Sequence, residues 1–277
     1  MTIERHPVND KRVEPSDQIH ISVPNAARAY DYLLGGAHNF AADRQLAALA
    51  ERNMPQIRDA MRLNRTFLRR VVRFMIASGI RQFLDVGSGI PTVGNVHEVA
   101  QEIDPQCRVV YVDKDRMAVL HSQLLLEGND RTVAIQADVR DPEAILGHPD
   151  TVRLLNLDEP VGLLMLFLWH FIPDSDDPLG LLARCKTALV PGSFLAISHI
   201  RRQTETTGLQ TMVEEVRRHG EDAIPRSYDQ LVPMFDGLDL VEPGITAPSA
   251  WRPEGPNDFS EQIDANRLVL VGVGRKP

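Results

Sequence analysis

The sequence is poor in cysteine and in long apolar runs. Its two cysteines, Cys107 and Cys185, lie far apart and match no metal-binding or redox spacing, which suggests a reducing compartment. The first residues, MTIERHPVNDKRVEPSDQ, have no apolar core, so we predict no secretory signal. The longest apolar stretch, Val161 to Phe171, is too short to span a bilayer. These absences predict a soluble, cytoplasmic protein that has no membrane partner.

A general excess of basic residues is also absent. Acidic residues outnumber basic ones by 38 to 30, which gives a formal net charge of −8. Nucleic-acid binding depends on a basic surface, and no stretch of this chain interleaves basic with aromatic residues. We therefore expect no nucleic-acid partner, although a local basic patch is compatible with this composition. The apolar fraction of 43% allows the 277 residues a sizeable core, in one large domain or two small ones.

The N-terminal part of the chain is predicted to be helical. A charged, proline-containing arm precedes Asn25, which can cap a first helix. A second helix is expected over Phe40 to Arg52, and a third begins at Pro55 and ends at Gly79. We divide the chain into an arm and helical cap over residues 1–54 and a main domain over residues 55–277.

From Ile80 onward, short apolar segments alternate with helical ones. Such alternation is typical of a parallel sheet that is covered by helices on both faces. The expected strands are 80–86, 108–113, 133–138, 161–167 and 192–198. The expected helices between them are 93–103, 116–126, 141–146 and 178–189, and two more follow Thr206. The last two strands, 238–243 and 266–277, are joined by a loop too polar for a crossover helix, so they can pair as an antiparallel edge.

Acidic residues and glycines follow the first three expected strands. The segment FLDVGSGIPTVG contains Asp85 and then Gly87 and Gly89, which allow a sharp turn and the close approach of a ligand. Asp113 ends the second strand and Asp138 the third. Ligands of open parallel sheets bind at these strand ends. There, one acid can accept hydrogen bonds from ribose hydroxyls, and the next can accept one from an adenine amino group. The pattern therefore predicts a nucleoside-containing cofactor.

Two cofactors fit such a turn, and the sequence favours one of them. A nicotinamide dinucleotide site requires a third glycine where this chain has Thr92, and Pro91 removes a backbone donor near the pyrophosphate. S-adenosylmethionine has no pyrophosphate and does not need that anion-binding turn. An NAD-type oxidoreductase is therefore the weaker alternative. A plain strand-to-helix connection is also disfavoured, because Asp113 and Asp138 stand at matching strand ends.

Most of the chain resembles a known family. The first three motifs are similar to those of the Rossmann-like S-adenosylmethionine-dependent methyltransferases. Five further segments resemble the signature motifs of one bacterial subfamily, the S-adenosyl methyltransferases once catalogued as a domain of unknown function. These segments are ARAYDYLLGGAHNFAADR, NRTFLRR, FLDVGSGIPT, DVRDPEAIL and GVGRKP. The resemblance implies a Rossmann-like α/β fold with a seven-stranded, mostly parallel sheet and an antiparallel last strand.

The resemblance also implies which residues bind S-adenosylmethionine. They are Asp85, Gly87, Ser88, Gly89, Asp113, Lys114, Asp138 and Val139. The turn after the first strand would flank the methionine part of the cofactor, Asp113 the ribose, and Asp138 with Val139 the adenine. Pro91 stands where many methyltransferases have a third glycine, and it makes this turn stiffer.

The third helix carries polar residues with two interpretations. Asn64 lies on the apolar stripe, where it either faces the amino-acid end of the cofactor or bonds to backbone in the core. Arginines recur every three or four residues at Arg58, Arg62, Arg65, Arg69 and Arg73. Such a row is more typical of a solvated face that pairs with acids. Arg65, beside Asn64, is the candidate for binding the carboxylate of the cofactor.

Candidates for acceptor binding lie near other strand ends and in the cap. His170 and His199 are expected just past the fourth and fifth strands, although a lone strand-end histidine is often structural. Tyr32 belongs to YDYLLGGAHNF, which suits either a lid over the site or a helix packed on the edge of the sheet. Trp251 could roof an acceptor pocket or fill a surface groove. No catalytic base and no metal site are assigned.

The sequence thus predicts an enzyme that transfers the methyl group of S-adenosylmethionine to an acceptor. An acidic chain whose cap roofs the site favours a small-molecule acceptor, because a nucleic acid would need an open basic groove. The alternative is a non-catalytic protein that binds S-adenosylmethionine as a sensor or assembly partner. Neither the acceptor nor the oligomeric state can be derived from the sequence.

Overall fold

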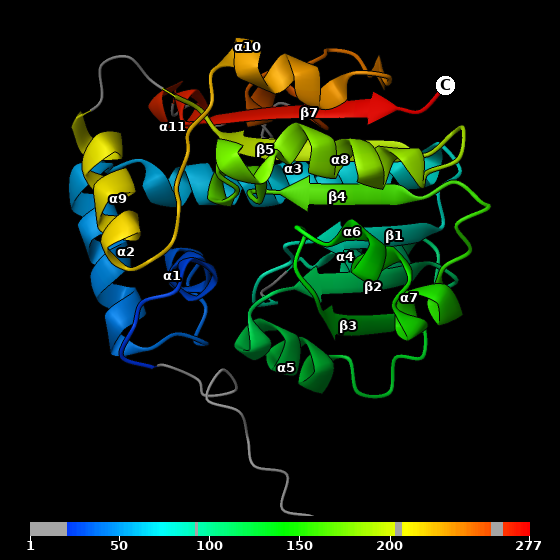
Figure 1. The fold of residues 1–277 in the computed structure, drawn as a ribbon, viewed down its shortest axis with the longest axis horizontal. Helices are drawn as coiled ribbons and strands as arrows, with labels where there is room; N and C mark the ends of the chain where they lie inside the picture. Colours follow the sequence, from blue (N-terminus) through cyan, green and yellow to red (C-terminus); the bar gives the residue numbers. More distant parts are fainter. Residues whose placement is uncertain (1–20, 92–93, 203–206, 256–262) are drawn as a thin grey trace, which may run out of the picture.

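A seven-stranded sheet forms the centre of the computed structural model, which describes residues 21–91, 94–202, 207–255 and 263–277 (Figure 1). Thr92 and residues 1–20 of the predicted arm lie outside the described residues. The strand order is β3-β2-β1-β4-β5-β7-β6. The strands are β1 Gln82–Val86, β2 Arg108–Asp113, β3 Thr132–Gln136, β4 Gly162–Leu166, β5 Phe194–Ile200, β6 Asp239–Leu240 and β7 Val269–Arg275.

The strand directions confirm the predicted fold class. Strands β1 to β5 are parallel, and β7 lies antiparallel between β5 and β6. The pairing of β5 with β7 extends to Ile200 opposite Val269, so β5 is longer at its carboxyl end than the sequence indicated. His199 therefore lies within β5, and the prediction that it follows the strand is wrong.

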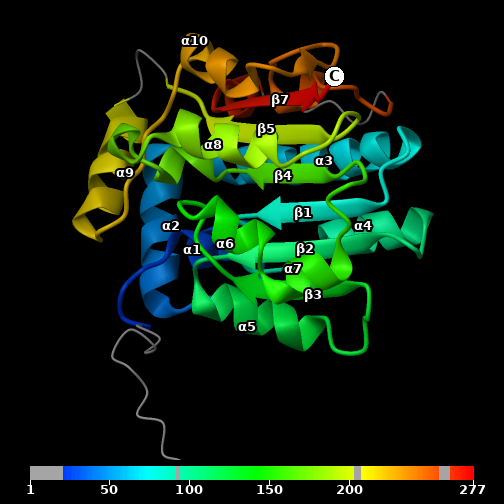
Figure 2. The same ribbon diagram turned by 45° about the vertical axis from the view of Figure 1, so that its right-hand side comes forward.

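Helices cover both faces of the sheet (Figures 1 and 2). Because successive strand residues point to opposite faces, each face has its own apolar cluster, with Phe83 in one and Leu84 in the other. The first face carries α3 Ile57–Ala77, α4 Val96–Ile103 and α5 Arg116–Leu125, and the second carries α6 Pro142–Leu146, α7 Pro149–Leu154 and α8 Pro178–Thr187. The sequence did not predict α7, because its 6 residues are too few to show a helical period.

The remaining elements are short or lie late in the chain. They are the helices α10 Tyr228–Leu231 and α11 Ile263–Arg267 and the 3₁₀ turns η2 Trp169–Phe171, η3 Asp174–Asp176, η4 Val232–Phe235 and η5 Pro248–Ala250, together with a helix of the cap that is described below. Within the described residues, no helix is both long enough and apolar enough to cross a membrane.

A helical cap stands beside the carboxyl ends of the parallel strands (Figures 1 and 2). It contains the two expected N-terminal helices, α1 Ala26–Leu33 and α2 Ala41–Asn53. It also contains α9 Thr207–Arg218, which packs against α2 and shares its apolar cluster. The cap therefore joins two distant parts of the chain, which the sequence did not predict. The division of the chain between residues 54 and 55 stays a prediction.

One buried carboxylate holds the start of the cap together. Asp43, which is fully buried, accepts hydrogen bonds from the backbone N–H groups of Asn25 and Phe40, each at 2.8 Å. It also pairs with the Nε of Arg28 at 2.8 Å, and this guanidinium donates to the carbonyl of Val23. One side chain thus fixes the N-terminal ends of both α1 and α2.

A second buried carboxylate shapes the turn between α1 and α2. Asp31 accepts hydrogen bonds from the backbone N–H of His38 at 2.9 Å and from the Nδ2 of Asn39 at 3.0 Å. A Cβ atom on Gly36 would lie 2.0 Å from a carboxylate oxygen of Asp31, so only glycine fits there. The turn therefore requires particular residues of the segment GGAHN, namely Gly36 for its lack of a Cβ atom and Asn39 for its hydrogen bond to Asp31.

We predict that Asp43→Asn destabilises the cap. A buried guanidinium that loses its carboxylate costs about 3–5 kcal/mol. Urea unfolding should show a loss on this order, and hydrogen exchange should be faster in α1 and α2. Asp59→Asn is the matched control, because Asp59 pairs with Arg62, whose side chain is 66% exposed. Equal stability of the two variants would contradict the role of Asp43.

Candidate functional site

The turns that follow β1, β2 and β3 meet at one end of a single cavity. Parallel strands place their carboxyl ends at the same edge of the sheet, which brings together residues far apart in the sequence. All the residues predicted to bind the cofactor line this end: Arg65, Asp85, Gly87, Ser88, Gly89, Asp113, Lys114, Asp138 and Val139. Asn64 lines the cavity as well. The contacts of these residues with a cofactor stay a prediction.

The glycine turn after β1 is fixed to the end of β2. The backbone N–H groups of Gly87 and Ser88 donate to the carbonyl of Val112 at 2.8 and 3.1 Å. Gly87 has φ +76°, and a Cβ atom there would lie 2.8 Å from the side chain of Leu168. Glycine at this position therefore satisfies both the backbone conformation and the close packing.

Asp113 completes this connection. One of its carboxylate oxygens accepts a hydrogen bond from the backbone N–H of Gly89 at 2.7 Å, and the other accepts one from the backbone N–H of Asp115 at 2.8 Å. Burial raises the pKa of Asp113 from its ordinary value of 3.8 to about 6, although these two hydrogen bonds lower it. A carboxylate offers about four lone-pair sites, so acceptor capacity remains for a ligand.

Asp85 lies deeper in the cavity wall and is 6% exposed. Burial raises its pKa from 3.8 to about 7, the positive charge of Arg65 lowers it, and Asp113 raises it. Arg65 comes from α3 and places its guanidinium carbon 5.6 Å from the centre of the Tyr30 ring. One buried acid, one half-buried acid and one arginine therefore meet where the glycine turn begins.

Asp138 and Val139 close the same end of the cavity. Asp138 accepts hydrogen bonds from the backbone N–H and the guanidinium of Arg140 at 2.9 and 3.0 Å. Arg140 is held in turn by Asp176 at 2.6 Å. Val139 is buried and offers an apolar surface beside these charges. This combination of an acceptor and an apolar wall suits a heterocyclic ring that carries an amino group.

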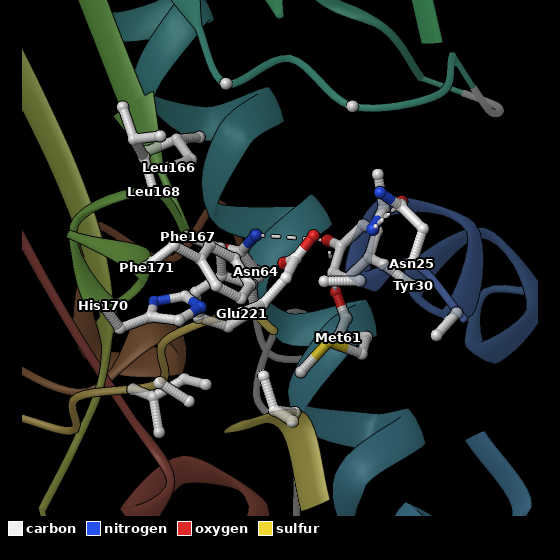
Figure 3. Close-up of a pocket in the computed structure, with 18 of the residues that line it drawn as sticks. Asn25, Tyr30, Met61, Asn64, Leu166, Phe167, Leu168, His170, Phe171 and Glu221 are labelled. Atoms are coloured by element: carbon white, nitrogen blue, oxygen red, sulfur yellow. Dashed lines mark hydrogen bonds between the residues drawn. The ribbon is translucent and has the colours of Figure 1, made fainter. Parts of the chain in front are cut away.

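The other end of the cavity is apolar and extends under the cap. Its walls come from α1, α2, α3, α9 and the turn after β4, and include Leu33, Ala50, Met61, Phe167, Leu209 and Met212. We call this part the apolar lobe. Tyr30 of α1 and Phe167 face each other edge to face, with ring centres 6.0 Å apart. The Nδ2 of Asn64 donates to the hydroxyl of Tyr30 at 3.1 Å (Figure 3).

His170 lines the cavity, and its imidazole points into the lobe (Figure 3). It is 2% exposed and packs against Phe167, Phe171 and His199. Burial lowers its pKa well below the ordinary value, and the nearby His199 and Arg226 lower it further. Burial thus disfavours the charged form of the ring, and its unpartnered Nδ1 is free to form a hydrogen bond with a ligand.

Three residues that the sequence suggested for acceptor binding do not line the cavity. Tyr32 does not line the cavity, because it lies about 200° around the helix from Tyr30. His199 lies behind His170, where its Nε2 is 3.2 Å from Arg226 and burial lowers its pKa to about 3. Trp251 is fully buried against Phe67 and Phe74 of α3, so it fills the core and roofs no pocket.

Several lining residues were missed by the sequence. Tyr30 and Asn25 were noted only as part of a lid and as a helix cap. Asn25 does cap α1, and its Nδ2 also donates to Asp115 at 2.9 Å, which ties the cap to the start of α5. Glu221 lies just beyond α9 and had no local signal, because only the position of α9 brings it to the cavity. Across the described residues, no group of three or more His, Cys, Asp or Glu could hold a metal ion.

The sequence as a whole matches one family. A family model described as S-adenosyl methyltransferase matches residues 12–277. The chain belongs to the S-adenosyl methyltransferase family. The predicted resemblance is therefore confirmed, and the methyl donor of this methyltransferase is S-adenosylmethionine. No curated protein matches the chain.

Solved structures support the same assignment. A DUF574-family protein from Streptomyces avermitilis is 35% identical, with a TM-score of 0.88, over 93% of this chain and 100% of that chain. A protein from Thermobifida fusca is 38% identical, with a TM-score of 0.86, over 96% of this chain and 99% of that chain. The plantazolicin methyltransferase BpumL, solved with S-adenosylhomocysteine, is 10% identical over 91% of this chain and 96% of that chain. Its TM-score of 0.51 shows a shared fold alone.

The charges at the cofactor end of this methyltransferase complement those of S-adenosylmethionine. Asp85 is buried and Asp113 is half-buried, and desolvation raises the pKa of both, so a positively charged ligand would stabilise their ionised forms. Arg65 offers a cation for the carboxylate of the ligand, and its Nε is buried without a partner among the described residues. The site therefore complements a ligand that carries both signs of charge.

We predict that Asp113→Ala weakens the binding of S-adenosylmethionine by about tenfold or more. Hydrogen bonds from two hydroxyls to one carboxylate each contribute about 1.5–3 kcal/mol, and the variant also releases the N–H of Gly89. Calorimetry should show this loss, while NAD binds neither form. Wild-type affinity in the variant would refute the assignment of Asp113.

Asp85 should make the stability of the free methyltransferase depend on pH. Its pKa is about 7 in the folded protein and 3.8 in its ordinary state, so the folded protein binds more protons between these values. The free energy of unfolding should therefore fall as the pH rises from about 4 to about 7, by on the order of 2–4 kcal/mol from this group. Urea unfolding across this interval should show a smaller decrease for Asp85→Asn. Asp229→Asn, at an exposed site on α10, should behave like wild type. Identical pH profiles for all three proteins would exclude a raised pKa at Asp85.

Proposed function

We propose that the protein transfers the methyl group of S-adenosylmethionine to a small molecule that binds in the apolar lobe. The observation that supports this proposal is the continuity of one cavity from the strand-end acids to the space under the cap. A cavity walled by α1, α2, α3 and α9 suits a ligand that it can largely enclose.

The reaction places few chemical demands on the protein. S-adenosylmethionine, when bound, supplies a methyl group that its sulfonium already activates. The chain then has to hold the acceptor in line and exclude water, which can account for much of the acceleration. Asp85 and Asp113 line the cofactor end, and Tyr30 and Phe167 face each other in the lobe.

The arginine row of α3 favours a small acceptor over a nucleic acid. Arg58 pairs with Glu51, and Arg62 pairs with Asp59 at 3.3 Å. Arg73 lies 3.4 Å from Glu254. Pairing with acids leaves this face with little net positive charge for phosphates. Neither alternative from the sequence, an NAD-type oxidoreductase or a non-catalytic sensor, gains support from the family or the fold.

The proposal predicts that labelled methyl groups pass to a compound of low mass. The protein would be incubated with methyl-labelled S-adenosylmethionine and a cell extract that is separated into small-molecule, protein and nucleic-acid fractions. Label should enter the small-molecule fraction, and Asp113→Ala should reduce it. Label confined to protein or nucleic acid would refute a small-molecule acceptor.

A low-salt titration with DNA and RNA is the companion measurement. Salt-sensitive binding that is lost when Arg58, Arg62 and Arg69 are replaced would also refute a small-molecule acceptor.

A further inference from the structure

The apolar lobe has a charge pattern that limits which acceptors it can bind. Among the described residues that line the cavity, the basic ones are Arg65, Lys114 and Arg140. Lys114 and Arg140 follow the ends of β2 and β3, and Arg65, which stands over the Tyr30 ring, interacts with the carboxylate of Asp85. A carboxylate or phosphate in the lobe would therefore lose its hydration beside a cation that already faces an acid, which is unfavourable.

One acidic side chain enters this apolar space. Glu221 lines the cavity, and Figure 3 shows its side chain extended toward the pair formed by Asn64 and Tyr30. The described residues provide no ion-pair partner for its carboxylate, whereas Glu215, on the outer part of α9, pairs with Arg218 and His219. A carboxylate that is directed into an apolar cavity accepts a hydrogen bond from whatever donor binds there.

Three other polar side chains of the lobe are drawn with Glu221 in Figure 3. They are the Asn64 amide, the Tyr30 hydroxyl and the His170 imidazole. Asn64 donates to Tyr30, and the ring of Phe167 contacts both Tyr30 and His170. The carbonyl oxygen of Asn64 and the Nδ1 of His170 are buried without a partner among the described residues. These groups therefore lie near one another, and most other side chains of the lobe are apolar.

We propose that the acceptor is a largely apolar molecule that carries no negative charge and presents one N–H or O–H group to Glu221. This inference rests on the proposed function and adds the class of the acceptor. In the transfer, the carboxylate of Glu221 accepts the proton of that group. The lone pair of the nitrogen or oxygen forms the new bond to the methyl carbon, and the electrons of the broken carbon–sulfur bond remain on sulfur.

Three probes with the same apolar body test the charge preference. They are 1-naphthol, 1-naphthylamine and 1-naphthoate, and their binding near neutral pH would be followed by naphthalene fluorescence with S-adenosylhomocysteine present. The alcohol and the amine should bind about tenfold more tightly than the carboxylate, because only the carboxylate is charged and has to lose its hydration beside Glu221. Equal binding of all three, or tighter binding of the carboxylate, would overturn the proposal. A preference of the alcohol over the amine, or the reverse, would distinguish an O–H from an N–H acceptor.

Glu221→Gln removes the negative charge and keeps the size of the side chain. The advantage of the alcohol and the amine over the carboxylate should shrink to about threefold or less in this variant. Glu214→Gln is the matched control, because Glu214 is exposed on α9 and does not line the cavity. An unchanged preference in Glu221→Gln would refute the role of Glu221.

Ala50→Trp fills the lobe from α2 and locates the probes. Ala50 is 7% exposed and lines the cavity from α2, whereas the strand-end acids lie at one edge of the sheet. All three probes should lose binding in this variant, while calorimetry shows unchanged affinity for S-adenosylhomocysteine. Probe binding that survives this substitution would refute the assignment to the lobe. Failure of the wild-type protein to bind S-adenosylhomocysteine would instead refute the proposed function, so the two failures are distinguishable.

Discussion

The hydrogen bond from the backbone N–H of Gly89 to the carboxylate of Asp113 is the contact on which the site depends. It joins the turn after β1 to the end of β2, beside the two further bonds that this turn makes to Val112. Because the bond is short and its acceptor is a carboxylate, it holds a glycine-rich segment in one conformation without a large side chain. The wall that this turn gives to the cavity beside Asp85 depends on this connection.

The cap adds what the sheet cannot provide. Helices α1, α2 and α9 come from opposite halves of the chain, and their shared apolar cluster closes the space above the strand ends. Asn25 links this cap to Asp115, and Tyr30 meets Phe167 across the cavity. The lid hypothesis for residues 26–44 stays a prediction, and these contacts are the ones that an opening of the cap would break.

The two ends of the cavity divide the chemistry between them. Buried and half-buried acids at the strand ends complement a ligand with positive charge, because desolvation leaves their own charges poorly compensated. The lobe has the opposite character, since apolar side chains from four helices surround a few polar groups. A cavity with this polarity can hold a charged donor and an apolar acceptor next to each other. This separation of charge between the two ends of the cavity is a property that the amino-acid composition alone does not reveal.

The sequence by itself determined the sheet, its parallel core and the strand-end acids. Strand periods, glycines and turn residues are local signals, and parallel strands oblige Asp85, Asp113 and Asp138 to meet at one edge. Tertiary structure alone decided which residues form the acceptor side. Tyr30 rather than Tyr32 lines the cavity because of the rotation of α1, and His199 lies behind His170 because β5 extends along β7. Glu221 reaches the cavity because α9 packs on α2, and no local pattern encodes a contact between segments so far apart in the chain.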